Sequence, residues 1–169
     1  LAIASKGTSY LPFNTINPGL DAEGREGLVP NWLTIVNLDE SKDQLFRVQK
    51  FYASGRPVVA SNLVGTVFCN VEGLGLTCRV PPLGRIDIEG GHVSPGVGNT
   101  GLIEVSALSE DAPYAAFLTR YAIVDAELKE RNKYSYALAI PAERPLATEI
   151  VVPVSKREEA DPWLELNNP

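Results

Sequence analysis

The sequence predicts an all-β fold, an antiparallel β-sandwich of about ten short strands with little helix. Turn residues recur at short and fairly regular intervals, and the segments between them are rich in β-branched and aromatic residues. The clearest strand signal is at residues 85–89, where Ile86 and Ile88 alternate with charged residues. This period of two indicates a strand with one buried face and one face in water.

The other elements follow from the same pattern. A second apolar stripe, Tyr134, Tyr136, Leu138 and Ile140, is backed by small residues, which suggests that its polar side is covered. Helix is expected only in two charged segments that could equally be exposed loops, 125–133 with Asp125 as N-cap and 155–163. The predicted strands are residues 32–38, 44–52, 57–60, 63–68, 76–80, 84–89, 101–108, 115–124, 134–140 and 148–154.

Length and composition fit one folded domain. The 169 residues, with 44% hydrophobic and 21% charged side chains, have the composition of a globular protein with a real core. We expect an N-terminal arm at 1–20, the β-sandwich at 21–154 and a C-terminal arm at 155–169. A net charge of −6 argues against nucleic acid as a partner, and no apolar run is long enough to predict a membrane span.

Cys69 and Cys78 are the only cysteines, nine positions apart around a loop that contains Gly73 and Gly75. A structural zinc site needs four Cys or His ligands, and the chain has a single histidine, His92. A thioredoxin-type pair needs C-x-x-C at a helix start. A disulfide across a β-hairpin fits the spacing best, and two unpaired thiols in a cytosolic protein are the alternative.

A disulfide would place the protein in an oxidising compartment, and the chain's start agrees with this. The sequence begins at Leu1 and contains no methionine. We expect that a signal peptide has been removed, although a shortened chain would look the same. The predicted location is therefore extracellular or on the cell surface.

Three further patterns are weaker as functional signals. Gly96, Gly98 and Gly101 match G-x-G-x-x-G, but a strand-like segment follows where a nucleotide-binding loop needs a helix. His92 has no nucleophile motif around it. The acidic runs at 21–27, 37–43 and 109–113 lack the calcium-loop pattern and are read as solvated turns. We predict no catalytic residue, no metal site and no cofactor.

Aromatic side chains are the remaining candidates for ligand binding. A carbohydrate-binding module presents a coplanar row of exposed aromatic rings on one face. Linear sequence does not show coplanarity, so core packing is the competing explanation for most of them. The residues concerned are Tyr10, Phe13, Trp32, Tyr52, Tyr114, Tyr121 and Trp163.

Both ends of the chain carry apolar residues that need burial. Leu1 and Ile3 alternate with small residues up to Gly7, so this segment is either the first strand of the sandwich or a donor strand for the next subunit. Gly7 would be the hinge of a donor strand. Near the other end, Trp163 and Leu164 follow a strongly polar run and could dock on the domain or on a neighbour. Leu1, Ile3, Trp163 and Leu164 are the predicted subunit interface.

Four segments of the sequence are "WLTIVNLDE", "FYASGRPV", "VPPLGRIDIE" and "AAFLTRYAIV". Together they resemble the secreted immunoglobulin-like β-sandwich modules of bacteria and archaea. The resemblance covers residues 32 to 124 and implies an immunoglobulin-like or jelly-roll-like sandwich in an extracellular protein; it transfers no catalytic residue. Cys69 and Cys78 are too close in sequence to bridge two sheets as in antibody domains.

The functional expectation is a non-enzymatic structural subunit of an extracellular assembly, such as a filament, a pilus-like fibre or a surface layer. It would self-associate through its terminal arms, and a head-to-tail contact that does not close generates a homopolymer. The alternative is a secreted module that binds carbohydrate, with a cell-surface glycan as its partner. An extracellular hydrolase ranks below both.

Overall fold

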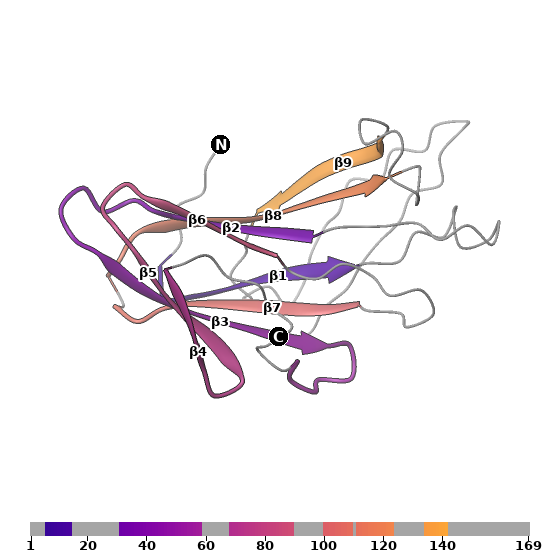
Figure 1. The fold of residues 1–169 in the computed structure, drawn as a ribbon, viewed down its shortest axis with the longest axis horizontal. Helices are drawn as coiled ribbons and strands as arrows, with labels where there is room; N and C mark the ends of the chain where they lie inside the picture. Colours follow the sequence, from indigo (N-terminus) through magenta and orange to yellow (C-terminus); the bar gives the residue numbers. More distant parts are fainter. Residues whose placement is uncertain are drawn as a thin grey trace, which may run out of the picture.

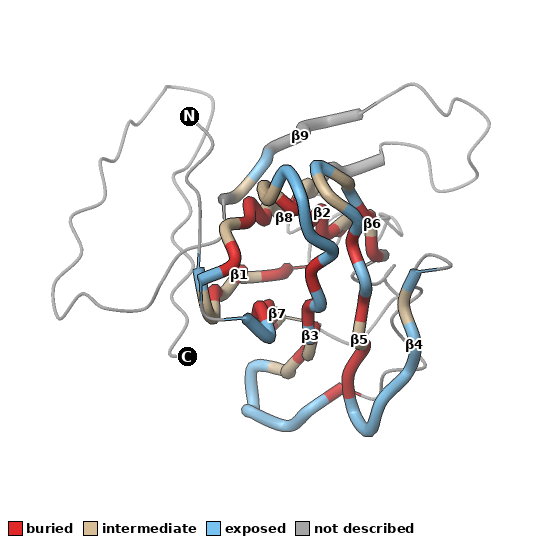
Figure 2. Tube along the Cα trace, turned by 90° about the vertical axis from the view of Figure 1, so that its left-hand side faces the viewer, coloured by how far each residue is buried: buried red, intermediate tan, exposed pale blue. Residues whose placement is uncertain are grey.

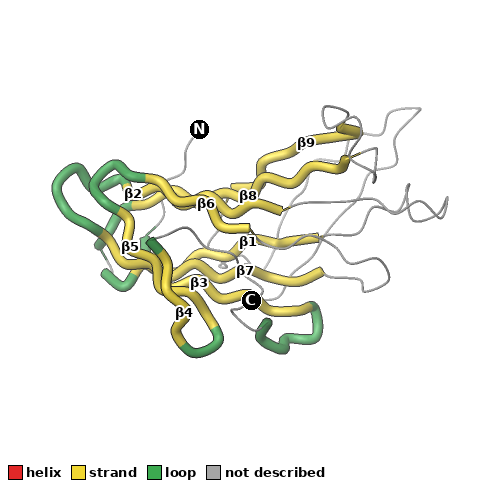
Figure 3. Tube along the Cα trace, viewed as in Figure 1, coloured by secondary structure: helices red, strands yellow, loops and turns green. Residues whose placement is uncertain are grey.

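We describe the protein from a computed structural model. Within the described ranges the chain forms nine β-strands and no helix (Figure 1, Figure 3). All paired strands are antiparallel. The described residues are 6–14, 31–58, 68–89, 100–109, 111–123 and 134–141.

The first sheet has five strands in the order β1-β7-β3-β5-β4. Its edges are β1 (Thr8–Asn14) and β4 (Cys69–Glu72). Between them lie β7 (Thr100–Ala107), β3 (Gln44–Tyr52) and β5 (Gly75–Val80). The first and last strands of this sheet are therefore separated by its full width (Figure 1).

The second sheet has four strands in the order β6-β2-β8-β9. They are β6 (Arg85–Glu89), β2 (Asn31–Asn37), β8 (Tyr114–Ile123) and β9 (Tyr134–Pro141). The ladder between β8 and β9 contains an irregularity at Ala122/Ile123. β2 and β8 are the central strands, and apolar side chains on their inner face are buried against the first sheet.

The two sheets lie face to face, and their inner faces supply one apolar core (Figure 1, Figure 2). Ile86 and Ile88 are buried while Arg85 is exposed, as their alternation predicts. The rings of Phe46 and Tyr114 meet edge to face across the core, with centroids 5.2 Å apart. The prediction of an all-β antiparallel sandwich is confirmed.

The strand predictions differ from the structure mainly at the edges. The N-terminal range 1–20 contains β1, which pairs with β7 of the same chain, so the sandwich includes residues 8–14. Of the predicted strand 63–68, only Phe68 is described, in a turn before β4, and residues 63–67 lie outside the described residues. In the predicted strand 57–60, Pro57 forms an isolated bridge with Phe51, and residues 59–60 lie outside the described residues. Residues 148–154 and the segments 125–133 and 155–163 lie outside the described residues.

The acidic run at 37–43 is a turn organised by its own side chains. The buried Asn37 amide donates to three carbonyls, those of Lys42, Val80 and Pro81, and so joins two loops. The Asp39 carboxylate accepts hydrogen bonds from Ser41 and from the Lys42 amide, which hold its pKa below the ordinary value. This run is a solvated turn, as its composition predicts.

Candidate functional site

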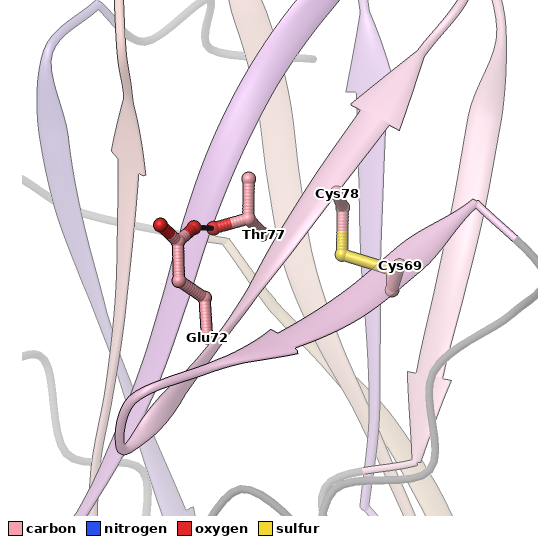
Figure 4. Close-up of a disulfide and its surroundings, with 4 residues drawn as sticks. All are labelled: Cys69, Glu72, Thr77 and Cys78. Carbon is pink, nitrogen blue, oxygen red and sulfur yellow. Dashed lines mark hydrogen bonds between the residues drawn. A yellow bond between two sulfur atoms is a disulfide. The ribbon is translucent and has the colours of Figure 1, made fainter.

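The two cysteines form a disulfide across the β4–β5 hairpin (Figure 4). Cys69 and Cys78 are direct partners in the register, and their Cα atoms are 4.0 Å apart. Gly73 in the connecting turn has φ +62°, a conformation that glycine adopts without steric cost. The hairpin disulfide predicted from spacing and turn residues is confirmed.

The disulfide holds a strand that the core does not cover. Val71 on β4 pairs with Leu76 on β5, so the two side chains share the inner face of the sheet. Leu76 is 2% exposed, but Val71 is 63% exposed. Figure 2 shows β4 as a mostly exposed strand beyond β5. The opposing sheet therefore stops short of β4.

Two more apolar side chains are exposed beside this strand. Phe68 precedes β4 and Leu74 lies in the turn that follows it, with 51% and 45% of their surfaces exposed. The opposite face of the hairpin is polar, and the Thr77 hydroxyl donates a hydrogen bond to Glu72 there (Figure 4). We call β4 with Phe68 and Leu74 the β4 edge.

The β4 edge differs from the other edges whose side chains the structure describes. Edge strands usually carry proline or charge that discourages pairing with another chain. On β1, Pro12 lacks a backbone donor, and on β6 Arg85 makes hydrogen bonds of 2.8 and 3.0 Å to Asp87. β4 carries one charged residue, Glu72, which hydrogen-bonds to Thr77 of the same sheet, and it also exposes the apolar side chain of Val71. The charge of Glu72 and the shortness of the strand are the features of β4 that limit pairing.

A fixed corner precedes β1 at the opposite edge of the same sheet. Gly7 has φ +69°, and its carbonyl accepts hydrogen bonds from the Ala107 amide, at 2.9 Å, and from the Tyr114 hydroxyl, at 3.1 Å. The Tyr114 hydroxyl also lies 2.6 Å from Ser9 Oγ. The point at which residues 1–6 join the sheet is thus held by both sheets.

The predicted interface residues Leu1, Ile3, Trp163 and Leu164 all lie outside the described residues, so the interface stays a prediction. His92 lies outside them as well. The last glycine of the G-x-G-x-x-G match, Gly101, is part of β7. A Cβ atom there would overlap the Phe51 carbonyl and press on the Phe13 ring, so tight packing explains this glycine.

The sequence analysis missed a buried cation inside the sandwich. Lys50 lies on the inner face of β3 beyond Phe46 and Val48, and its Nζ atom is 4.0 Å from the centroid of the Phe13 ring. Burial lowers the pKa of Lys50 from 10.5 to about 8. Attraction between the ammonium and the ring face offsets part of this cost. The signal was present, because the apolar alternation of "QLFRVQKFY" runs into a lysine.

Asparagine residues make the end of the core near Lys50 polar. Asn31 on β2 and Asn14 on β1 are both buried, and the Asn31 amide donates to the Asn14 carbonyl at 3.2 Å. This contact joins the two sheets at the end of the sandwich where Lys50 lies. In the part of the chain that the structure describes, no group of three or more His, Cys, Asp or Glu side chains is arranged to hold a metal.

The aromatic candidates divide between the core and the outer faces. Phe13 and Tyr114 are buried, as core packing predicts, while Tyr10, Trp32 and Tyr52 are partly exposed. Trp32 and Phe117, which the sequence analysis did not single out, share the outer face of the second sheet because Trp32 pairs with Thr119 and Thr34 with Phe117. Trp163 and the Tyr121 side chain lie outside the described residues.

The comparisons with known proteins bear on the fold alone. No protein-family model matches the sequence, and no curated protein matches it. A solved structure, the crystal structure of Thermotoga maritima 1070, is similar with a TM-score of 0.50 and 10% sequence identity, over 82% of this chain and 94% of that chain. Among the described residues, no helix has the length and apolar character needed to cross a membrane.

Proposed function

We propose that the protein is a non-enzymatic structural subunit of an extracellular assembly, and that residues 1–6 and 163–164 make contacts between subunits. The observation that carries this proposal is the corner at Gly7. The pairing of β1 with β7 ends at Thr8, and Gly7 is held in a left-handed conformation by Ala107 and Tyr114. In the sequence, the apolar alternation of Leu1 and Ile3 precedes this fixed corner, and it is the part of the chain that we propose for contacts between subunits.

The disulfide supports the location. A bond between Cys69 and Cys78 persists in oxidising compartments and is removed by cytosolic reductants. It also stabilises an exposed edge, which an extracellular protein needs because proteases and partners reach such a strand first.

The test is removal of residues 1–6, with oligomeric state measured by analytical ultracentrifugation and negative-stain microscopy. We expect the shortened protein to be a folded monomer and the parent to assemble. The matched control places the same two charges at the alternate positions of the segment. Leu1→Asp combined with Ile3→Asp should abolish assembly, whereas Ala2→Asp combined with Ala4→Asp should weaken it less. A shortened protein that still forms the parent's assemblies would refute the proposal for this segment.

A second candidate is a module that binds carbohydrate, favoured by the outer face of the second sheet. Trp32 and Phe117 are partly exposed on adjacent strands, and Asp87 beside them accepts a hydrogen bond of 2.6 Å from Thr34. Sugars bind to aromatic rings flanked by such polar groups. Binding of the monomer to a glycan array, lost in Trp32→Ala and kept in Tyr52→Ala, would favour this candidate.

A further inference from the structure

The β4 edge and residues 1–6 lie at opposite edges of one sheet. The sheet order β1-β7-β3-β5-β4 puts four strand spacings between β1 and β4. The register also aligns them, because Thr8 pairs with Ser106, Ser106 with Arg47, Arg47 with Thr77 and Thr77 with Asn70. The start of β1 and the middle of β4 are therefore the two ends of one row across the sheet.

We propose that the β4 edge is the acceptor for residues 1–6 of a second copy of this chain, which add to the sheet as an extra strand beside β4. This inference rests on the proposed function and names the surface that the arm of a neighbour would occupy. Strand addition of this kind takes its affinity from backbone hydrogen bonds and its specificity from alternating side chains. Leu1 and Ile3 would cover the apolar face that Val71 leaves open.

The distance across the sheet excludes the same copy as the donor. Neighbouring strands are about 4.8 Å apart, so four spacings span about 19 Å. Six residues reach about 20 Å when fully extended. A segment that starts at Gly7 would use its whole length to cross the sheet and would have none left to lie along its own β4. The donor must be another molecule.

The disulfide orders β4, the acceptor strand, before a donor segment binds. Apart from Cys69, every residue of β4 is exposed, so packing contributes little to holding the strand on β5. The Cys69–Cys78 bond fixes β4 in register with β5, and among the described strands none pairs with the outer side of β4. An acceptor that is already ordered does not lose that conformational entropy on binding.

The geometry also sets the form of the assembly. Donor and acceptor lie on opposite edges of each copy, so every molecule can give one segment and receive one. Such a heterologous contact continues from copy to copy, as a filament or a ring. The five-stranded sheets would be joined through the donated strands.

The experiment mixes two variants of the full chain that each lack one half of the contact. Val71→Lys, on an exposed position, disables the acceptor and keeps residues 1–6; deletion of residues 1–6 removes the donor and keeps the β4 edge. We expect each variant alone to be a monomer and the mixture to form a one-to-one heterodimer that grows no further. Circular dichroism and thermal melting verify that both variants are folded.

The matched control is Leu108→Lys, which places the same charge on another exposed aliphatic residue away from the β4 edge and should assemble like the parent. If Val71→Lys also assembles like the parent, the acceptor is elsewhere and this inference fails while the proposed function stands. If the protein lacking residues 1–6 assembles, the proposed function fails first. Monomers in the mixture would refute the pairing of these two surfaces.

Discussion

Replacement of Cys69 by serine should lower the free energy of unfolding by roughly 2.7 kcal/mol, the chain-entropy value for closing a loop of about ten residues. The bonded cysteines are nine positions apart. Cys69 is the better position to change, because Cys78 is fully buried and a hydroxyl there would add a desolvation cost. For a domain of this size the loss corresponds to a fall in melting temperature of about 5–11 °C.

The structure also predicts which part of the protein loses stability when the disulfide is removed. Opening β4 exposes little apolar surface, since Asn70, Val71 and Glu72 are already exposed. Without the disulfide, amide hydrogen exchange should accelerate first in β4. The exchange rate of the β2 amides in the core should change only as far as the global free energy of unfolding changes.

The assay is chemical denaturation combined with hydrogen exchange, on the parent, the Cys69→Ser variant and the parent treated with a reductant. The variant and the reduced parent should agree, which separates the lost bond from any effect of serine. A melting temperature that changes by less than about 1 °C would refute the entropic reasoning. Equal acceleration of exchange in β2 and β4 would refute the view that β4 is a separately held edge.

Three other outcomes are expected. Gly101→Ala should destabilise the fold by about 3 kcal/mol or more in denaturant melts, because its Cβ overlaps the Phe51 carbonyl, whereas Gly55→Ala in an open turn should cost less. Tyr114→Phe should cost about 1–3 kcal/mol, because it removes hydrogen bonds that include the one to the part-buried Gly7 carbonyl. The pKa of Lys50 is about 8 folded and 10.5 unfolded, so the unfolded state binds more protons between these values and stability rises with pH there. The stability of Lys50→Met relative to the parent, measured by urea melts, should therefore fall from pH 8 to pH 10.5; a constant difference would contradict the assignment.

Local sequence predicted the elements in which apolar and polar residues alternate regularly. β3 has the predicted bounds 44–52, and Ile86 and Ile88 face the core as their period requires. The hairpin disulfide followed from cysteine spacing and turn glycines, since cross-strand distance in a hairpin depends only on local geometry. These features need no knowledge of what lies opposite in the fold.

Features that depend on the opposite layer were not predictable. Val71 and Leu76 look alike in sequence, yet only Leu76 is covered by the second sheet. Lys50 follows the apolar positions of β3 and so enters the core, where the Phe13 ring from a distant strand lies next to it. The sequence alone did not single out Phe117, because only the pairing register of β2 and β8 places it near Trp32.

The sequence by itself determined the fold class, most of the strands and the bond between Cys69 and Cys78, because alternation and turn chemistry act over a few residues. The tertiary structure decided that Gly7 is a fixed corner, that β1 belongs to the sheet, and that β4 is an edge the core leaves open. Those facts depend on the order of strands and on how far one sheet extends over the other, and both are set by contacts between residues far apart in the chain.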